Sequence, residues 1–191
     1  MRHLKTFILL SIIMVLSACD DDIIDTDMSE EIADFQFTTQ DNEKLGLEDL
    51  EGEWWIAYFM YTECTIVCPQ TTPNMVKVQK ELGDLGLEPQ IISFSIDPEN
   101  DTPDVLKEYA DEYQVDLNNW TFLTGYDFDE IQKLSKKSFK TVLEGGGPNT
   151  HEFVHSTYFF LVNPDGQIVK KYDGLSDEEV DALVGDLKKA L

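Results

Sequence analysis

Two cysteines spaced C-x-x-x-C, Cys64 and Cys68, are the residues of this chain best suited to chemistry. They follow the apolar run 54–60, so we predict that they lie between a buried strand and the start of a helix. The N-terminus of a helix favours thiolate over thiol, and the thiolate is the form that attacks disulfides and binds metal ions. The pair is therefore either a redox dithiol or part of a metal site.

The four-residue spacing bears on this choice. Helical residues four apart have β-carbons ~5–6 Å apart, whereas a disulfide needs about 3.8 Å. A metal ion bound to two sulfurs at ~2.3 Å leaves those sulfurs roughly 4 Å apart. The spacing suits a bridging metal better than a disulfide, without forbidding the disulfide or a purely structural role for it. Two thiolates favour Cu(I), zinc or an iron–sulfur site.

The further ligand candidates are His151 and His155, since His3 lies in a segment predicted to be removed. In extended chain, four residues at ~3.3 Å place the two imidazoles about 13 Å apart, too far for one ion to bind both. We predict that His155 lies on a strand over residues 153–162, and a loop can carry it from there toward the cysteines. A strand histidine is more often a core or surface residue, and we interpret His151 as a surface residue.

The N-terminus has the pattern of a secretory signal. A basic start is followed by an apolar run over residues 7–16, which is shorter than the ~20 residues that span a membrane. Leu16-Ser17-Ala18-Cys19 resembles the bacterial lipobox, in which Cys19 receives lipid and becomes the mature N-terminus. The alternative is a plain anchor helix with an incidental cysteine.

This pattern predicts three regions: a lipoprotein signal peptide (1–18), an acidic tether with lipidated Cys19 (19–33) and one domain (34–191).

The chain of 191 residues has 38 acidic and 14 basic side chains, a formal charge of −24. Removing residues 1–18 leaves 12 basic and 38 acidic side chains, a charge of −26. Such acidity disfavours nucleic-acid binding and electrostatic docking on anionic lipid, and it permits cationic partners such as metal ions.

The elements that must position the cysteines alternate between strand and helix. Apolar runs predict strands, and amphipathic spacing predicts the helices between them. A turn at 163–166 joins the last two strands, and a helix at 176–191 ends the chain. We therefore predict an α/β sandwich with a central mixed β-sheet flanked by helices; the strands are at 35–37, 54–60, 91–96, 120–123, 153–162 and 167–172, and the earlier helices at 70–85, 103–113 and 128–139.

Three motifs, in order, resemble the SCO/SenC family over roughly residues 33–190. They are Tyr61-Thr62-Glu63-Cys64-x3-Cys68-Pro69, the run 95–103 (SIDPENDTP), and Val154-His155-Ser156 leading to Asn163-Pro164-Asp165-Gly166. The resemblance implies a membrane-tethered, thioredoxin-like protein that is a metallochaperone rather than an enzyme. It also implies that the protein binds copper, as Cu(I) or Cu(II), and helps to assemble the CuA centre of cytochrome c oxidase subunit II.

By the same resemblance, Cys64, Cys68 and His155 are the copper ligands, and Asp97 is an acidic residue near the site, linked to copper handling and partner contact. Many members have proline after the first cysteine, where this chain has Thr65. Thioredoxin-like disulfide exchangers carry a cis-proline before the strand that faces their cysteines. Residues 154–158 contain no proline, and a histidine stands close to that place.

Two functions remain open from the sequence. One is the copper metallochaperone; the other is an extracytoplasmic thiol–disulfide oxidoreductase that keeps the CuA cysteines reduced through a Cys64–Cys68 disulfide, and both can hold together. A peroxidase of the peroxiredoxin type needs an arginine, and Arg2, the only one, is lost with the signal peptide. Either way the expected location is the extracytoplasmic face of the cell membrane.

Overall fold

A mixed β-sheet forms the centre of the computed structural model, which describes residues 24–145 and 153–191. Its strand order is β1-β8-β7-β4-β5-β6-β2-β3, with β4, β5 and β6 parallel and the other pairs antiparallel. The strands are β1 (Glu30–Glu31), β2 (Gln36–Thr39), β3 (Lys44–Gly46), β4 (Trp55–Met60), β5 (Gln90–Ser95), β6 (Trp120–Thr124), β7 (Tyr158–Val162) and β8 (Gln167–Asp173).

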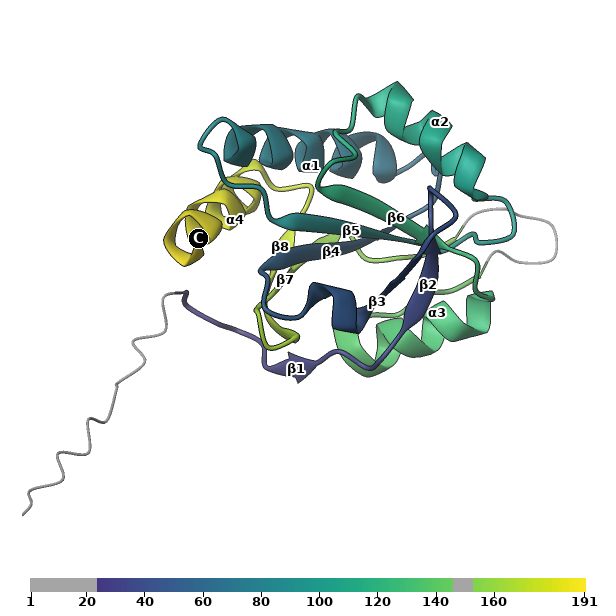
Figure 1. Ribbon diagram of the computed structural model, residues 1–191, viewed down its shortest axis with the longest axis horizontal. Coiled ribbons are helices and arrows are strands. Elements are labelled where there is room, and N and C mark those ends of the chain that lie inside the picture. The colour runs from purple at the N-terminus through teal and green to yellow at the C-terminus, as the bar shows by residue number, and fades with distance from the viewer. Residues whose placement is uncertain (1–23, 146–152) are drawn as a thin grey trace, which may run out of the picture.

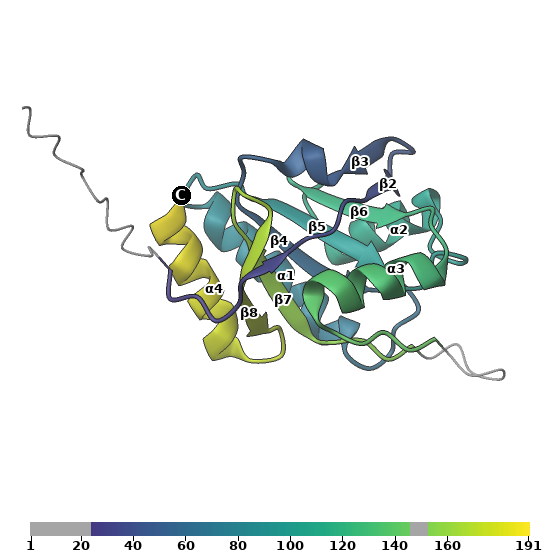
Figure 2. The ribbon, with the colours of Figure 1, turned by 90° about the horizontal axis from the view of Figure 1, so that it is seen from below.

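Helices cover both faces of this sheet, which confirms the predicted α/β sandwich. The helix α1 packs against α4 and lies beside α2, while α3 lies on the opposite face (Figures 1 and 2). The helical segments are the 3-10 turn η1 (Leu47–Leu50), α1 (Cys68–Gly83), α2 (Pro103–Tyr113), α3 (Phe128–Leu134), the π-helical turn η2 (Ser135–Phe139) that continues α3, and α4 (Asp177–Ala190).

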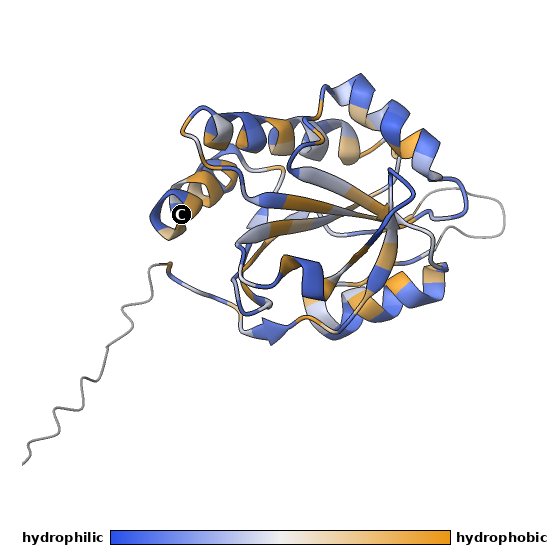
Figure 3. Cartoon of the chain, viewed as in Figure 1, coloured by the Kyte–Doolittle hydropathy of each residue, from blue (hydrophilic) through white to orange (hydrophobic). Residues whose placement is uncertain are grey.

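The strand β4 is buried on both faces, as its unbroken apolar sequence predicts. Alternate side chains point to opposite faces of a strand. Tyr58 contacts Trp120 and Phe159 edge-on, at ring distances of 6.1 and 5.6 Å. Phe59 instead packs on Phe139 at 5.1 Å, on the α3 side. In Figure 3 the central strands carry orange, apolar stretches beside pale ones. The double burial holds in place the strand that leads into the cysteines.

The carboxyl ends of β4 and β5 lie side by side, with Met60 paired to Ser95. The segments that follow these two strands, which carry the cysteines and the 97–103 motif, therefore meet at one edge of the sheet. The predicted start of α2 is confirmed, because Thr102 accepts a hydrogen bond from the N–H of Val105 and Pro103 opens the helix.

One strand prediction was wrong in its extent. The predicted strand 153–162 is a strand only from Tyr158 onward. Val154 exchanges two backbone hydrogen bonds of 3.0 Å with Glu144, which follows η2, instead of pairing with β4 or β8. Because this segment is tied to another partner, His155 lies ahead of β7 and not on it.

The acidic N-terminal segment also differs from its prediction as a solvated tether. Ile24 and Ile32 are buried, and the N–H groups of Asp27 and Met28 both donate to the carbonyl of Val169. From Ile24 onward the segment belongs to the folded domain, because these apolar side chains and the β1–β8 pairing hold it there. The predicted signal peptide, Cys19 and His151 lie outside the described residues. No described helix has the length and apolar character needed to cross a membrane.

Candidate metal centre

The cysteines lie on the turn between β4 and α1. The N–H of Cys64 donates to the carbonyl of Tyr61 at 3.2 Å, which closes the turn. Cys68 is the first residue of α1, and Pro69 follows in the first helical turn. The N–H of Cys68 donates to Sγ of Cys64 at 3.3 Å, so one sulfur caps the helix that the other begins.

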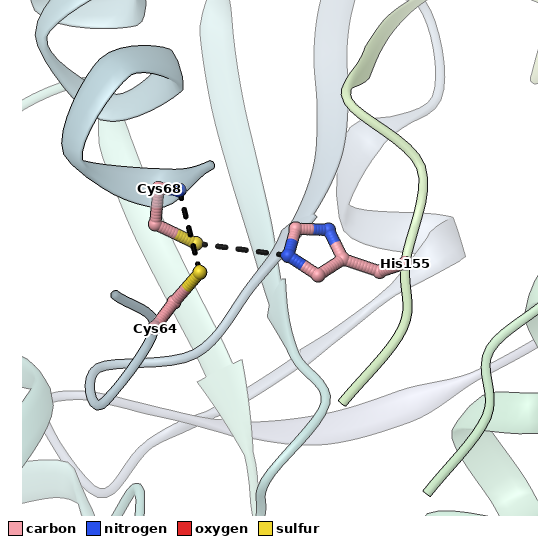
Figure 4. Close-up of side chains that lie close together, drawn as sticks. All are labelled: Cys64, Cys68 and His155. Atoms are coloured by element: carbon pink, nitrogen blue, oxygen red, sulfur yellow. Dashed lines mark hydrogen bonds between the residues drawn. The ribbon is translucent and has the colours of Figure 1, made fainter. Parts of the chain in front are cut away.

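His155 approaches this pair from the segment before β7. Its Nε2 lies 3.7 Å from Sγ of Cys68, and the two sulfurs and a ring nitrogen lie within 4.8 Å of one another (Figure 4). Its Nδ1 lies 2.8 Å from the carbonyl oxygen of Ser156. A carbonyl only accepts, so Nδ1 carries the proton and Nε2 presents a lone pair to the sulfurs. The structure thus brings together the three residues that the sequence singled out.

The two thiols share one proton. Hydrogen bonds from the Cys68 thiol and from backbone N–H groups hold the pKa of Cys64 well below its ordinary value, despite burial. The pKa of Cys68 is raised, because its thiol donates to Cys64 and because it is buried. The pair therefore holds a thiolate at Cys64 and a thiol at Cys68. Neither is in a disulfide here.

Tyr61 attaches the histidine segment to the cysteine turn, a contact that sequence reasoning missed. Its hydroxyl accepts the N–H of Phe153 at 3.4 Å. Its ring packs edge-on against Phe153 and His155, at 5.2 and 5.9 Å. Burial raises the pKa of Tyr61 to about 12, so the phenol is neutral and can keep these contacts. Its place directly before the turn was the only signal in the sequence.

The two aspartates of the 97–103 motif have different surroundings. Asp97, which the resemblance placed near the site, accepts two hydrogen bonds from the side chain of Asn100, at 3.0 and 2.8 Å. Asp101, noted above only as a member of the run 95–103, is fully buried and accepts hydrogen bonds from Thr62 on the cysteine turn. Burial raises the pKa of Asp101 to about 6. Of the two carboxylates, Asp101 is the one bonded to the cysteine turn.

The donor set fits a single soft metal ion. An ion about 2.3 Å from two sulfurs and 2.0 Å from a nitrogen, in a plane, leaves the donor atoms roughly 4 Å apart. The donors of Cys64, Cys68 and His155 all lie within 4.8 Å of one another before any ion is added. Sulfur and imidazole ligands suit copper in both of its oxidation states, and they suit zinc.

A dithiol between a central strand and helix α1 of this sandwich defines a thioredoxin-like protein, and the imidazole beside it defines a three-ligand metal site. A family model described as SCO1/SenC matches residues 25–191. A SCO1 protein homolog of Bacillus subtilis (strain 168) is 38% identical over 179 residues, 94% of this chain and 92% of the relative. The chain belongs to the SCO1/SenC family, which confirms the resemblance.

Solved structures of the same family share the fold. A SCO1/SenC family lipoprotein from Bacillus anthracis str. Ames has a TM-score of 0.79 at 38% identity, over 84% of this chain and 94% of that one. BsSco, described as a Sco family cytochrome c oxidase assembly protein with a disulfide switch, has a TM-score of 0.78 at 39% identity, over 87% and 96%. Bradyrhizobium japonicum ScoI with copper bound has a TM-score of 0.70 at 25% identity, over 83% and 98%.

Proposed function

We propose that this protein is a copper metallochaperone that assists assembly of the CuA centre of cytochrome c oxidase subunit II, with Cys64, Cys68 and His155 as its copper ligands. The observation that carries the proposal is the convergence of two sulfurs and a ring nitrogen within 4.8 Å. Family membership supports it, since BsSco is described as an oxidase assembly protein and ScoI was solved with copper.

Copper is the cargo of this site, and the chain's own groups prepare it. Cys64 offers a thiolate and His155 a lone pair on Nε2, while Cys68 must give up its proton when the ion binds. Two thiolates and an imidazole accept Cu(I) and can also hold Cu(II). Delivery is a ligand exchange, in which cysteines of the receiving protein replace these donors.

A second candidate is the thiol–disulfide oxidoreductase that keeps the CuA cysteines reduced. The lowered pKa of Cys64 favours it, because a thiolate is the attacking form in disulfide exchange. The oxidoreductase function does not explain the position of His155, because disulfide exchange needs only the two thiols. Copper binding uses all three residues, and we therefore place it first.

The location we propose is the extracytoplasmic face of the cell membrane. The lipobox ending at Cys19 provides a lipid anchor, and a SCO1/SenC family member from Bacillus anthracis is described as a lipoprotein. Residues 20–23 then separate the lipid from Ile24, where the folded domain begins. The site therefore works close to the membrane that holds the oxidase.

The test is titration of the purified, reduced protein with Cu(I) and with Cu(II). We expect one ion per chain. His155→Ala should weaken Cu(II) binding by at least about tenfold and change its visible spectrum, because Cu(II) favours imidazole beside thiolate. Cu(I) should lose less, because two thiolates can hold it.

His151→Ala is the matched control and should bind copper as the unchanged protein does. Oxidase assembly in cells under low copper gives the second readout. If His155→Ala assembles oxidase normally while Cys64→Ala does not, the thiol reductase replaces the metallochaperone as the proposed function.

A further inference from the structure

Asp101 is a buried carboxylate that reaches the cysteine turn from the start of α2. Its side chain is 0% exposed. Its Oδ1 accepts the backbone N–H of Thr62 at 3.2 Å and the hydroxyl of Thr62 at 2.6 Å. Its Oδ2 accepts the hydroxyl of Ser95 at 2.5 Å. Both oxygens are therefore bonded to the ends of the two central strands.

Thr62 is the residue through which Asp101 acts on the site. The N–H of Cys64 bonds to the carbonyl of Tyr61, which makes Thr62 an inner residue of the turn that presents Cys64. The N–H of such an inner residue has no partner within the turn itself. Asp101 supplies that partner and also accepts from the side chain, so the turn is held at two points.

The negative charge of Asp101 has no cation to offset it. No ion pair of the described residues involves this carboxylate, and its bonds are to neutral donors. Burying a carboxylate without a cation destabilises the fold, because the charge loses its hydration. A neutral side chain could accept the hydrogen bonds of Thr62 with a smaller loss of stability. The hydrogen bonds of Asp101 therefore do not by themselves explain why this residue carries a charge.

We propose that Asp101 is a positioning residue of the copper site, which holds the turn that presents Cys64 and whose charge favours Cu(II) over Cu(I) there. This inference rests on the proposed function. Two thiolates and a neutral imidazole give a net charge of zero with Cu(II) and of minus one with Cu(I). A fixed negative charge behind the turn repels the second complex and not the first, and burial strengthens the effect.

The test is the ratio of Cu(II) to Cu(I) affinity of the purified, reduced protein, measured with competing chelators for each oxidation state. Asp101→Asn removes the charge at nearly constant volume. We expect it to shift this ratio toward Cu(I) by about tenfold, and to alter the visible spectrum of the Cu(II) form. Asp104→Asn, which removes an exposed carboxylate from the same helix, is the matched control and should leave the ratio unchanged.

Two neutral changes keep the inference testable if Asp101→Asn does not fold. Thr62→Val and Ser95→Ala each remove a hydroxyl that donates to the carboxylate, which raises its pKa, so both are measured at about pH 9, where the carboxylate keeps its charge. The less compensated charge should then leave the ratio unchanged or move it toward Cu(II).

A shift toward Cu(I) in either neutral variant, or an unchanged ratio in folded Asp101→Asn, overturns the inference and leaves copper binding by the unchanged protein intact. Failure of the unchanged protein to bind copper overturns the proposed function, and this inference with it.

Discussion

Replacing Asp101 with asparagine should remove a specific pH dependence of folding stability. Burial raises the pKa of this carboxyl from 3.8 to about 6 in the folded protein. The folded state therefore binds this proton more tightly than the unfolded state does. Stability falls as pH rises between 3.8 and 6, because ionising the group then costs more in the fold than in the unfolded chain.

The size of the effect follows from the two pKa values. Each tenfold change in proton affinity is worth about 1.36 kcal/mol, so the ionised carboxylate costs the fold about 3 kcal/mol at pH 7. Asparagine lacks this cost, although its single oxygen and its amide N–H groups serve the donors of Thr62 and Ser95 less well. Leaving such a donor unsatisfied costs about 1–3 kcal/mol at every pH. The pH dependence, and not the stability at one pH, therefore identifies the buried charge.

The assay is urea unfolding of the reduced, metal-free protein from pH 4.5 to 7.5, a range above the sequence pI of about 4.1. Other titrating groups cancel when Asp101→Asn is compared with the unchanged protein at each pH. Stability of the unchanged protein relative to the variant should decrease by about 2 kcal/mol across this range. A constant difference would show that Asp101 titrates normally, and a difference of the opposite sign would show that the fold stabilises the charge; either result refutes the reasoning.

Two further predictions concern the cysteines. Oxidation of Cys64 and Cys68 to a disulfide should abolish stoichiometric copper binding, because no other cysteine among the described residues lies at the site. The copper titration described above measures this, and undiminished affinity in the oxidised form would place the ligands elsewhere. Cys19→Ser should release the protein from the membrane fraction, since lipid on this residue is the proposed anchor. Full retention of a processed Cys19→Ser chain, assayed by fractionation, would contradict the lipid anchor.

The fold was predictable where burial dictates the sequence pattern. The apolar run of β4 and the cap of α2 carry local signals, and both elements lie where the sequence predicts them, within one or two residues. The extent of the strand at 153–162 was not predictable, because Val154 pairs with Glu144 through hydrogen bonds that no local pattern encodes. The pairing of β1 with β8 was also not predictable, because the acidic segment around Ile32 has no local pattern that indicates a strand.

The candidate site was predictable in part. The C-x-x-x-C pair at the end of an apolar run carries its own signal, because strand, turn and helix are adjacent in sequence. The residues alone made His155 only a candidate ligand, and the family resemblance supplied its ligand role, since its approach depends on an irregular segment 87 positions away from Cys68. Tyr61 and Asp101 were missed because their contacts, with Phe153 and Thr62, span long sequence separations.

Preorganisation of the three donors and ease of release are both required of a metallochaperone, and the geometry reconciles them. Asp101 accepts the N–H of Thr62 in the turn, Tyr61 holds the histidine segment, and the N–H of Cys68 holds the sulfur of Cys64. Three protein donors are one fewer than a closed tetrahedral site has, so an incoming thiolate can bind before a ligand leaves. The side chains of Ile66 and Val154, beside the ligands, are 63% and 59% exposed, so the site opens onto surface that a receiving protein can contact. A rigid site with an open position exchanges its cargo through a bound intermediate and does not have to unfold to let the ion go.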